Sequence, residues 1–325
     1  MRYIHQLAHA CLAASLLAAA PLAANAQAFP TKPVTLIVPY AAGGLTDNLA
    51  RGLASRLSAK WKQAVLVDNR PGGATTIGTA AVARAPADGH VLLLTSFGFV
   101  TSQIMVPNLP YKADALKPLI MVSEAPSVLL VHPSVPATDV AGLVARMKSG
   151  PPLSFASSGN GSSPHIAAEL FGSMVGAEIV HVPYRGNAPG LTDLVGGQVQ
   201  AMFDSLASMS FVKAGQLRVI GIASAARSAR APDVPTLQEQ GVQSLTGFRS
   251  GSWFGLLVPA GTPGELQSRL YADISAVLAT PEMQDIIVRS GTEPVTMSQD
   301  EFAVYLKAEL DRMGPVIRSK NIRSD

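Results

Sequence analysis

Apolar and polar positions follow two alternating periods along this chain. Residues 34–40 form an apolar run rich in β-branched side chains, which favours a strand, and residues 48–57 space their apolar positions as one face of a helix does. The run at residues 91–96 is apolar on both faces, which is typical of a buried parallel strand. This alternation predicts right-handed crossovers and a parallel sheet covered by helices on both faces.

The middle of the chain repeats this pattern, with strands expected at residues 153–156, 179–183, 199–204 and 217–224. Two further apolar strands, 128–133 and 253–259, each end at a proline and bracket this middle block. We therefore predict two doubly wound α/β domains. Residues 29–127 plus 255–325 form a discontinuous first domain, and residues 128–254 form an inserted second domain. The chain would cross between the domains twice.

A glycine-containing loop joins the first strand to its helix. Its sequence, Tyr40-Ala-Ala-Gly-Gly-Leu-Thr-Asp47, has two glycines that let the backbone turn tightly and approach a ligand. Either Thr46 or Asp47 is expected to cap the helix, which leaves backbone N–H groups and the positive end of the helix dipole facing outward. That arrangement suits an anion. We call residues 40–47 the first glycine loop.

A second loop of the same kind joins the strand at 153–156 to the helix at 164–175. It reads Ser157-Ser-Gly-Asn-Gly-Ser162, and we call it the second glycine loop. Ser96, at the carboxyl end of a buried strand, occupies the usual place for ligand contacts in open α/β sheets. Tyr184, which follows a proline, is a further candidate contact. Two such loops in two α/β halves predict one anionic ligand held between them.

The composition excludes several function classes. Formal net charge is +3, and the basic residues are scattered without a basic run or aromatic interleaving, so nucleic-acid binding is not expected. The six histidines lack metal-ligand spacing. The Gly159-Asn-Gly161 segment lacks the third glycine of a dinucleotide fingerprint. We therefore predict no metal and no cofactor.

The first residues predict export. A positive start at Arg2 precedes an apolar core at residues 11–20 that is too short to span a bilayer. Ala24-Asn-Ala26 is a small-x-small signal, so residues 1–26 are expected to leave as a signal peptide, with cleavage after Ala28 as an alternative. Cys11 leaves with this segment, so the mature chain has no disulfide and no thiol catalysis. The predicted location is the periplasm.

Ordered motifs along the whole mature chain carry a family resemblance. They are Phe29-Pro-x-Lys-Pro-Val34, Ile37-Val-Pro-Tyr-x-Ala-Gly-Gly-x-Thr-Asp47, Asn69-Arg-Pro-Gly72, Ser157-Ser-Gly-x-Gly-Ser162 with His165 and Glu169, His181-Val-Pro-Tyr-Arg-Gly186, Asp193-Leu-x-Gly-Gly-Gln-Val199, Met202-Phe-Asp204, Pro232-Asp-Val-Pro-Thr236 and Trp253-Phe-Gly255. In this order and spacing they closely resemble the substrate-binding proteins of tripartite tricarboxylate transporters, often called the Bug family.

The resemblance implies a periplasmic binding protein with two domains and two crossovers, monomeric, that closes over a small organic carboxylate. It would deliver that carboxylate to a permease of one large and one small membrane subunit. By the same resemblance, backbone amides of both glycine loops hold a carboxylate group, and Asp204 orients the ligand. Leu45 stands where the family often has proline, and its side chain could line the pocket. The predicted ligand contacts are Gly43, Gly44, Leu45, Thr46, Asp47, Ser96, Ser157, Ser158, Gly159, Asn160, Gly161, Ser162, Tyr184 and Asp204.

Two alternative functions stay open from the residues alone. Ser162, Ser163 and His165, with Asp193 or Asp204, suggest a periplasmic hydrolase or isomerase, although the chain has no Gly-x-Ser-x-Gly nucleophile elbow. A position in the first turn of a helix is the favoured role for His165. A receptor of this kind could also present its loaded form to a membrane sensor. The missing catalytic constellation favours a receptor over an enzyme.

Overall fold

Ten strands of the computed structural model pair into one mixed sheet within the described residues, 29–323. The path of the sheet is β2-β1-β3-β9-β4-β7-β5-β6, and β8 and β10 (Glu293–Pro294) both pair with β4. The predicted signal peptide, residues 1–26, lies outside the described residues. Within that described range, no helix combines the length and apolar character that a membrane crossing requires.

Each end of the sheet consists of three parallel strands. At one end β1 lies between β2 and β3, and at the other end β5 lies between β6 and β7. The prediction of parallel strands joined by helices is therefore confirmed at both ends. The strands are β1 (Val34–Val38), β2 (Val65–Asn69), β3 (Val91–Ser96), β5 (Leu153–Ser157), β6 (Ile179–Pro183) and β7 (Ala201–Ser205).

Antiparallel strands connect the two parallel sets. β4 (Leu116–Val131) pairs with β9 (Gly251–Pro259) through Pro126 and, from Ser127 onward, with β7 and with β8 (Arg218–Ile222). The sequence pattern predicted only residues 128–133 as a strand here, so its first part was missed. Pro118 and Pro126 break the apolar run, but β4 tolerates Pro118 at a register irregularity.

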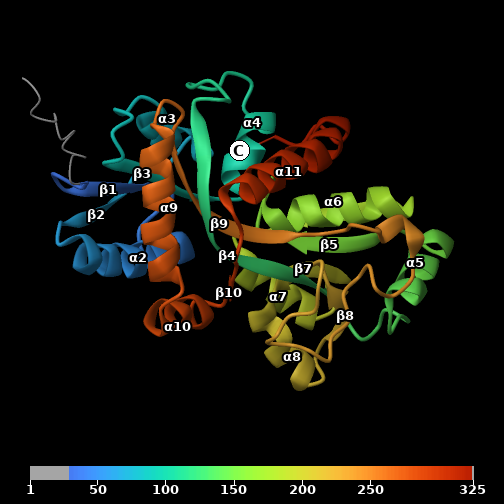
Figure 1. The fold of residues 1–325 in the computed structure, drawn as a ribbon. Coiled ribbons are helices and arrows are strands. Elements are labelled where there is room, and N and C mark those ends of the chain that lie inside the picture. The colour runs from blue at the N-terminus through green and yellow to red at the C-terminus, as the bar shows by residue number, and fades with distance from the viewer. Residues whose placement is uncertain (1–28, 324–325) are drawn as a thin grey trace, which may run out of the picture. The chain divides into compact units, whose positions relative to one another are not determined.

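Helices flank the sheet (Figure 1). α2 packs with α9 and α10, and α11 packs with α4 and α6. The helices are α2 (Leu45–Trp61), α3 (Thr76–Ala83), α4 (Gly98–Met105), α5 (Val140–Ser149), α6 (Ser163–Val175), α7 (Asn187–Val195), α8 (Met209–Lys213), α9 (Gly264–Leu278), α10 (Pro281–Arg289) and α11 (Gln299–Ser319), with short 3-10 turns at η1 (Leu206–Ser208) and η2 (Gln243–Leu245).

Alternate residues of the central strands enter two different cores. Leu129 and Phe203 pack in a core with residues of α5 and α6, whereas their chain neighbours Leu130 and Met202 pack in a core whose edge includes residues of α7 and α8. Because successive side chains of a strand point to opposite faces, these two cores lie on opposite faces of the sheet. Helices therefore cover both faces in this part of the molecule, as predicted.

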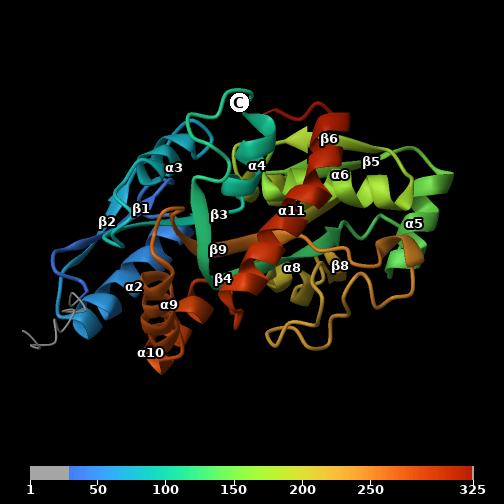
Figure 2. The same cartoon turned by 45° about the horizontal axis from the view of Figure 1, so that its top comes forward.

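α11 joins the two parts of the sheet. It begins with a capping box, in which the Ser298 hydroxyl accepts from the Glu301 N–H and the Glu301 carboxylate accepts from the Ser298 N–H. Phe302, near its start, packs edge-on against the buried Trp253 with ring centroids 5.6 Å apart. Val316, near its end, enters the core that contains α6. Figures 1 and 2 show α11 beside α4 and α6 from two directions.

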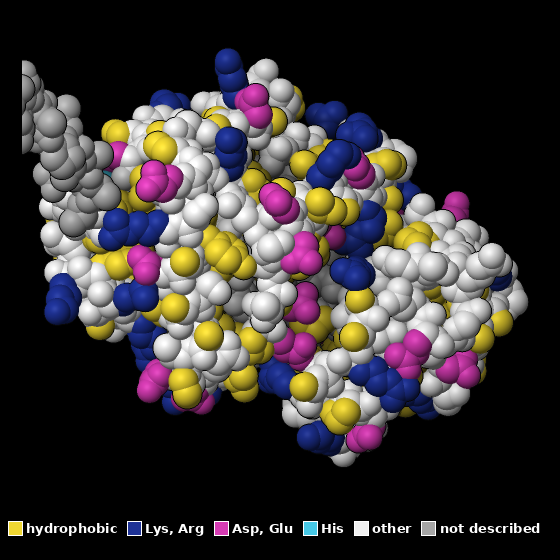
Figure 3. All heavy atoms as spheres, in the orientation of Figure 1, with side chains coloured by type: hydrophobic (Ala, Val, Ile, Leu, Met, Phe, Trp, Pro, Cys, Tyr) yellow, Lys and Arg dark blue, Asp and Glu magenta, His cyan; other side chains and the backbone are white. Residues whose placement is uncertain are grey.

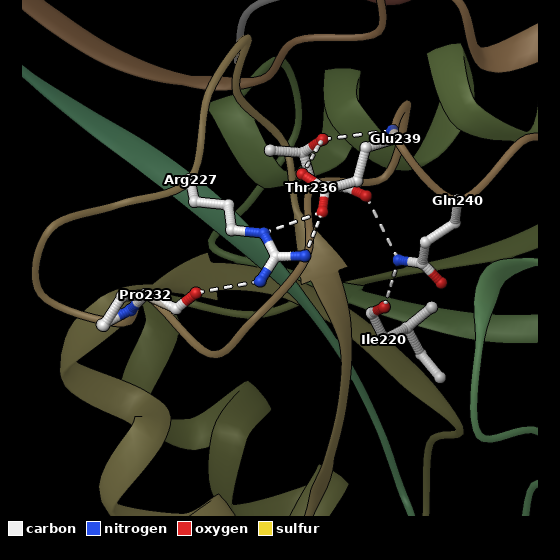
Figure 4. Close-up of polar contacts among 6 residues, drawn as sticks. All are labelled: Ile220, Arg227, Pro232, Thr236, Glu239 and Gln240. Carbon is white, nitrogen blue, oxygen red and sulfur yellow. Dashed lines mark hydrogen bonds and ion pairs between the residues drawn. The ribbon is translucent and has the colours of Figure 1, made fainter.

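The long connection between β8 and β9 is held by side-chain hydrogen bonds (Figure 4). Arg227 Nε donates to the Glu239 carboxylate at 2.7 Å, and the Thr236 hydroxyl donates to the same carboxylate at 3.2 Å. Gln240 Nε2 donates to the Ile220 carbonyl of β8 at 2.8 Å. These bonds fasten a segment that lacks strand pairing along most of its length.

Candidate functional site

The first glycine loop and Ser96 lie at the same edge of the sheet. β1 and β3 are parallel neighbours, with Leu36 level with Leu92, so their carboxyl ends share an edge. The loop leaves β1 at that edge, and Ser96 is the last residue of β3 and is buried there. This edge is where open α/β sheets bind ligands.

A buried carboxylate fixes the first glycine loop. Asp47 Oδ2 accepts from the Gly43 N–H at 2.8 Å and from Arg51 Nε at 3.0 Å. Burial alone would raise the pKa of Asp47, but the bonds from Arg51 and Gly43 outweigh it and hold that pKa below its ordinary value. Gly43 has a φ of +83°, the left-handed conformation that glycine adopts without strain.

The start of α2 differs from the prediction. Gly44 is the N-cap and α2 begins at Leu45, so neither Thr46 nor Asp47 caps the helix. The Gly43 N–H also donates to Asp47 Oδ2, so its hydrogen bond is made within the loop. The first four N–H groups of a helix have no acceptor within the helix, so the N–H groups of residues 44–47 are the donors that the start of α2 can offer.

The second glycine loop bonds to itself in the same manner. The Gly159 N–H donates to Ser157 Oγ at 3.1 Å, and the Ser162 hydroxyl donates to the Gly159 carbonyl at 2.6 Å. The Gly161 N–H donates to His165 Nδ1 at 3.0 Å. Two amides that the sequence assigned to a ligand therefore hold the loop in shape. Ser158 is half-buried and Asn160 is exposed at the surface of the loop.

Two histidines lie beneath the second glycine loop. The rings of His165 and His181 stack with centroids 3.5 Å apart and planes inclined by 5°. His181 Nε2 lies 2.6 Å from Ser157 Oγ. Burial, and then the neighbouring His181, lower the pKa of His165 from 6.5 to about 4, and burial also lowers the pKa of His181.

Asp204 is satisfied by protein groups on both of its oxygens. Oδ1 accepts from Asn187 Nδ2 at the start of α7, and Oδ2 accepts from the Ser208 hydroxyl of η1 at 2.6 Å. The Tyr184 hydroxyl donates to Asp193 Oδ2 at 2.6 Å. Burial, then this hydrogen bond and the charge of Asp193, raise the pKa of Tyr184 to about 12. Both side chains therefore brace the segments that surround the second glycine loop.

Each parallel set of strands has a carboxyl edge, and the register directs the carboxyl end of β3 and the carboxyl end of β7 towards each other. Ser96 of β3 is level with Phe254 of β9, which is level with Ser123 of β4. Ser205, the last residue of β7, is level with Ser127 of β4, and both β3 and β7 run towards the stretch between these two levels. At 3.3 Å per residue, Ser123 and Ser127 are about 13 Å apart along the strand.

A direct contact also links the second glycine loop to the end of α4. A methyl group built on Gly161 would lie 2.8 Å from the Met105 sulfur. Met105 is the last residue of α4, the helix that follows Ser96. The second glycine loop therefore packs against the end of α4.

Comparison with known proteins decides the family. Residues 49–322 match the family described as tripartite tricarboxylate transporter family receptor. The chain belongs to this family. It is thus a solute-binding receptor, as the ordered motifs predicted.

Individual relatives are similar to this receptor over nearly the full length of both chains. BugT of Bordetella pertussis is 34% identical over 305 residues, which cover 92% of each chain. The solved structure of Rpa4515 from R. palustris, with adipate, is 34% identical, covers 91% of this chain and 99% of its own, and has a TM-score of 0.71. A TctC solute-binding protein from Polaromonas without ligand is 27% identical, with coverage of 90% and 99% and a TM-score of 0.82. The predicted fold class is confirmed by these receptors.

Several polar residues near the carboxyl ends of β1 and β3 were not among the predicted contacts of the receptor. The hydroxyls of Tyr40 and Thr95 are buried and form no hydrogen bond of good geometry with the described residues. Burial raises the pKa of Tyr40 to about 12. Thr75 has a φ of +77°, a strained conformation for a residue with a Cβ, and its side chain lies against Gly98. Tyr40 ends the first apolar run and Thr95 precedes Ser96 at the end of β3, so both positions at strand ends could have indicated ligand contacts.

Two cavities of the receptor lie near this region. One, of about 380 Å³, is lined by Asn160, by the stacked histidines and by charged residues that include Lys320 and Arg323. The other, of about 170 Å³, lies at the crossover, which is the point near Pro126 where β4 changes its partner from β9 to β7. It is lined by Glu124, Pro126, Ala223, Arg227, Arg249, Gly251, Glu293, Tyr305, Glu309 and Arg312, among others. Figure 3 shows acidic and basic side chains side by side in the middle of one face.

Proposed function

We propose that this receptor captures one small organic carboxylate between the two glycine loops and delivers it to a tripartite transporter of one large and one small membrane subunit. The observation that carries the proposal is that both loops leave strands whose carboxyl edges face each other across the β4 crossover. A helix start at each loop favours a negative charge between them. The relative solved with adipate supports a dicarboxylate as the first candidate.

The proposed contacts come from the start of α2 and from the outer residues of the second glycine loop. N–H groups of residues 44–47 would donate to one carboxylate group, and Ser158 and Asn160 would reach the ligand from the other loop. The other predicted contacts would act by shaping or bracing the site, except Ser96, which would form its floor. They are Gly43, Ser157, Gly159, Gly161, Ser162, Tyr184 and Asp204.

We also propose that residues 29–127 plus 255–325 and residues 128–254 act as two domains that close on the ligand. The change of β4 partners at Ser127 supports the first boundary, and the start of β9 at Gly251 lies close to the second. The relative without ligand has a TM-score of 0.82 and the adipate complex one of 0.71, although the adipate protein is more similar in sequence. That order is expected if the present structure is the open form.

The compartment and the absence of catalysis belong to the same proposal. The predicted signal peptide supports export to the periplasm, where a monomeric receptor would meet its membrane partner. Ser157 and His181 have the spacing of a nucleophile and its base, but Ser157 is fully buried and its oxygen also accepts from Gly159. Such a serine is a structural group, and incubation with ester substrates should give no turnover above the uncatalysed rate.

Calorimetry with adipate, succinate, citrate and the uncharged diamide of adipate tests the function. One-to-one binding of at least one carboxylate is expected, and the diamide should bind at least tenfold more weakly because it cannot form charge-assisted bonds. Equal binding of adipate and its diamide would contradict a carboxylate site. No detectable binding of any of the three acids would contradict the proposed substrate class.

Replacing Asp204 by alanine should weaken carboxylate binding about tenfold, because Asn187 and Ser208 would lose their shared acceptor. Asp204→Asn keeps one acceptor oxygen, so its affinity should lie between those of the wild type and Asp204→Ala. Asp139→Ala is the matched control, since Asp139 caps α5 in the same half of the chain and its loss should lower stability by about 1 kcal/mol without changing affinity. Equal affinities of Asp204→Ala and wild type would show that Asp204 does not serve the site.

A further inference from the structure

The stacked imidazoles of His165 and His181 come from two different elements. His165 lies in the first turn of α6, and His181 lies in the middle of β6. Their centroid separation of 3.5 Å is van der Waals contact between parallel rings. Two imidazolium ions would repel each other strongly at this distance, so the geometry fits a pair that is neutral.

Each imidazole holds a different part of the second glycine loop. His165 Nδ1 accepts the Gly161 N–H at 3.0 Å, which requires that Nδ1 carry no proton. His181 Nε2 lies 2.6 Å from Ser157 Oγ, and that oxygen in turn accepts the Gly159 N–H at 3.1 Å. With a proton on His181 Nε2, the serine oxygen accepts two bonds and its hydroxyl donates to the Gly159 carbonyl at 3.1 Å.

We propose that His165 and His181 are the positioning residues of the ligand site, since the neutral pair fixes the backbone of the second glycine loop in the shape that receives a carboxylate. This inference rests on the proposed function. Neither imidazole needs to touch the ligand. Each acts through the backbone of the loop, because a rotated Gly159 or Gly161 would turn the neighbouring Ser158 and Asn160 away from the site.

The charges around the pair also disfavour a proton on it. Glu169 of α6 and Lys320 and Arg323, beyond α11, line the cavity that reaches both rings. Glu169 is the acidic side chain among the described residues of that lining, and it is already paired with Lys320 at 3.2 Å. The cavity of about 380 Å³ gives water access to the rings, so the pair can exchange protons with solvent.

A proton on His165 would remove the acceptor of the Gly161 N–H. Burial, followed by His181, lowers the pKa of His165 from 6.5 to about 4, so the folded protein binds this proton more weakly than the unfolded chain. The contribution of His165 to stability is therefore complete above about pH 6.5 and falls as the pH drops towards about 4. The affinity for a carboxylate should also fall, by about twofold at pH 4, because half of the molecules then carry the proton on His165.

Two substitutions separate the hydrogen-bond acceptor from the volume of the ring. His165→Asn places an oxygen near the position of Nδ1 and cannot be protonated, whereas His165→Leu fills the space without an acceptor. Adipate calorimetry at pH 7.5 should give His165→Asn an affinity within about threefold of wild type and His165→Leu an affinity roughly tenfold lower. His132→Asn is the matched control. Nδ1 of the His132 ring bonds to Ser134, at the surface, so this substitution should leave affinity unchanged.

The pH dependence of affinity distinguishes a role in ligand binding from a purely structural role. The ratio of wild-type to His165→Asn affinity should fall about twofold from pH 7 to pH 4, since titration of adipate itself cancels in the ratio. Imidazole ¹⁵N spectra should show His165 Nδ1 as an unprotonated acceptor at pH 7. A flat ratio, a protonated Nδ1, or His165→Leu binding as tightly as wild type would overturn the inference. Wild-type protein that binds no tested carboxylate would overturn the proposed function instead.

Discussion

Replacement of Asp47 by alanine is expected to lower the free energy of unfolding by about 3 kcal/mol and to weaken carboxylate binding roughly a hundredfold. The Asp47 side chain is 3% exposed, and one of its oxygens accepts from both the Gly43 N–H and Arg51 Nε. Hydrogen bonds to a charged group contribute more than neutral ones, and here they fix the turn that sets the start of α2. Without them the first glycine loop loses its shape together with the donors at the helix start.

Asp285 offers a close control for Asp47. Both aspartates pair with an arginine four residues later at 3.0 Å, but the Asp285 side chain is 58% exposed. Asp285→Ala should therefore cost about 0.5 kcal/mol or less and leave affinity unchanged. Urea unfolding measures the stability of both variants, and calorimetry with adipate measures affinity. If both aspartate variants lost the same small amount of stability, the buried bond to Gly43 would not support the loop.

Replacement of Gly251 by alanine should lower the free energy of unfolding by about 3 to 4 kcal/mol. Gly251 begins β9 at the crossover, with a φ of +152°. A methyl group there would lie 2.3 Å from the Ala125 carbonyl oxygen and 2.9 Å from the Pro126 Cα. Both neighbours are backbone atoms of β4, so relief would require separating the paired strands. Binding should weaken as well, because the Ser163 hydroxyl next to the second glycine loop donates to the Gly251 carbonyl at 3.1 Å.

Gly241 distinguishes this clash from backbone strain alone. Its φ is +83°, but a methyl group built on it meets no atom within 4 Å. Gly241→Ala should therefore cost about 1 kcal/mol, the ordinary penalty for a left-handed residue with a Cβ. The difference between the two variants in urea unfolding isolates the contact at the crossover. A Gly251→Ala protein as stable as Gly241→Ala would show that β4 and β9 separate easily at this point.

Local sequence patterns were sufficient wherever one element bordered on the next. The apolar run at residues 34–40 contains β1, and the serine and glycine spacing at 157–162 marks the turn into α6. They were insufficient for β4, because Pro118 and Pro126 hide a strand whose backbone pairs with several partners distant in sequence. Strand pairing of this kind depends on neighbours that periodicity does not reveal.

The acceptors of the loop amides in the candidate site also could not be predicted from the sequence. Gly43, Gly159 and Gly161 were expected to donate to a ligand, and each instead donates to a side chain of the protein. Asp47 and Ser157 lie within the loops, so the bonds to Gly43 and Gly159 are local. The stacking of His165 on His181 joins residues of a helix and a strand, so no motif could have predicted it.

The sequence by itself determined the alternation of strands and helices, the two glycine loops and the family, because each depends on residue types at short, fixed spacings. The tertiary structure alone decided which amides remain available at those loops and that β3 and β7 run towards one stretch of β4. The physical reason is that hydrogen-bond partners and strand register are set by groups that meet only after the chain has folded.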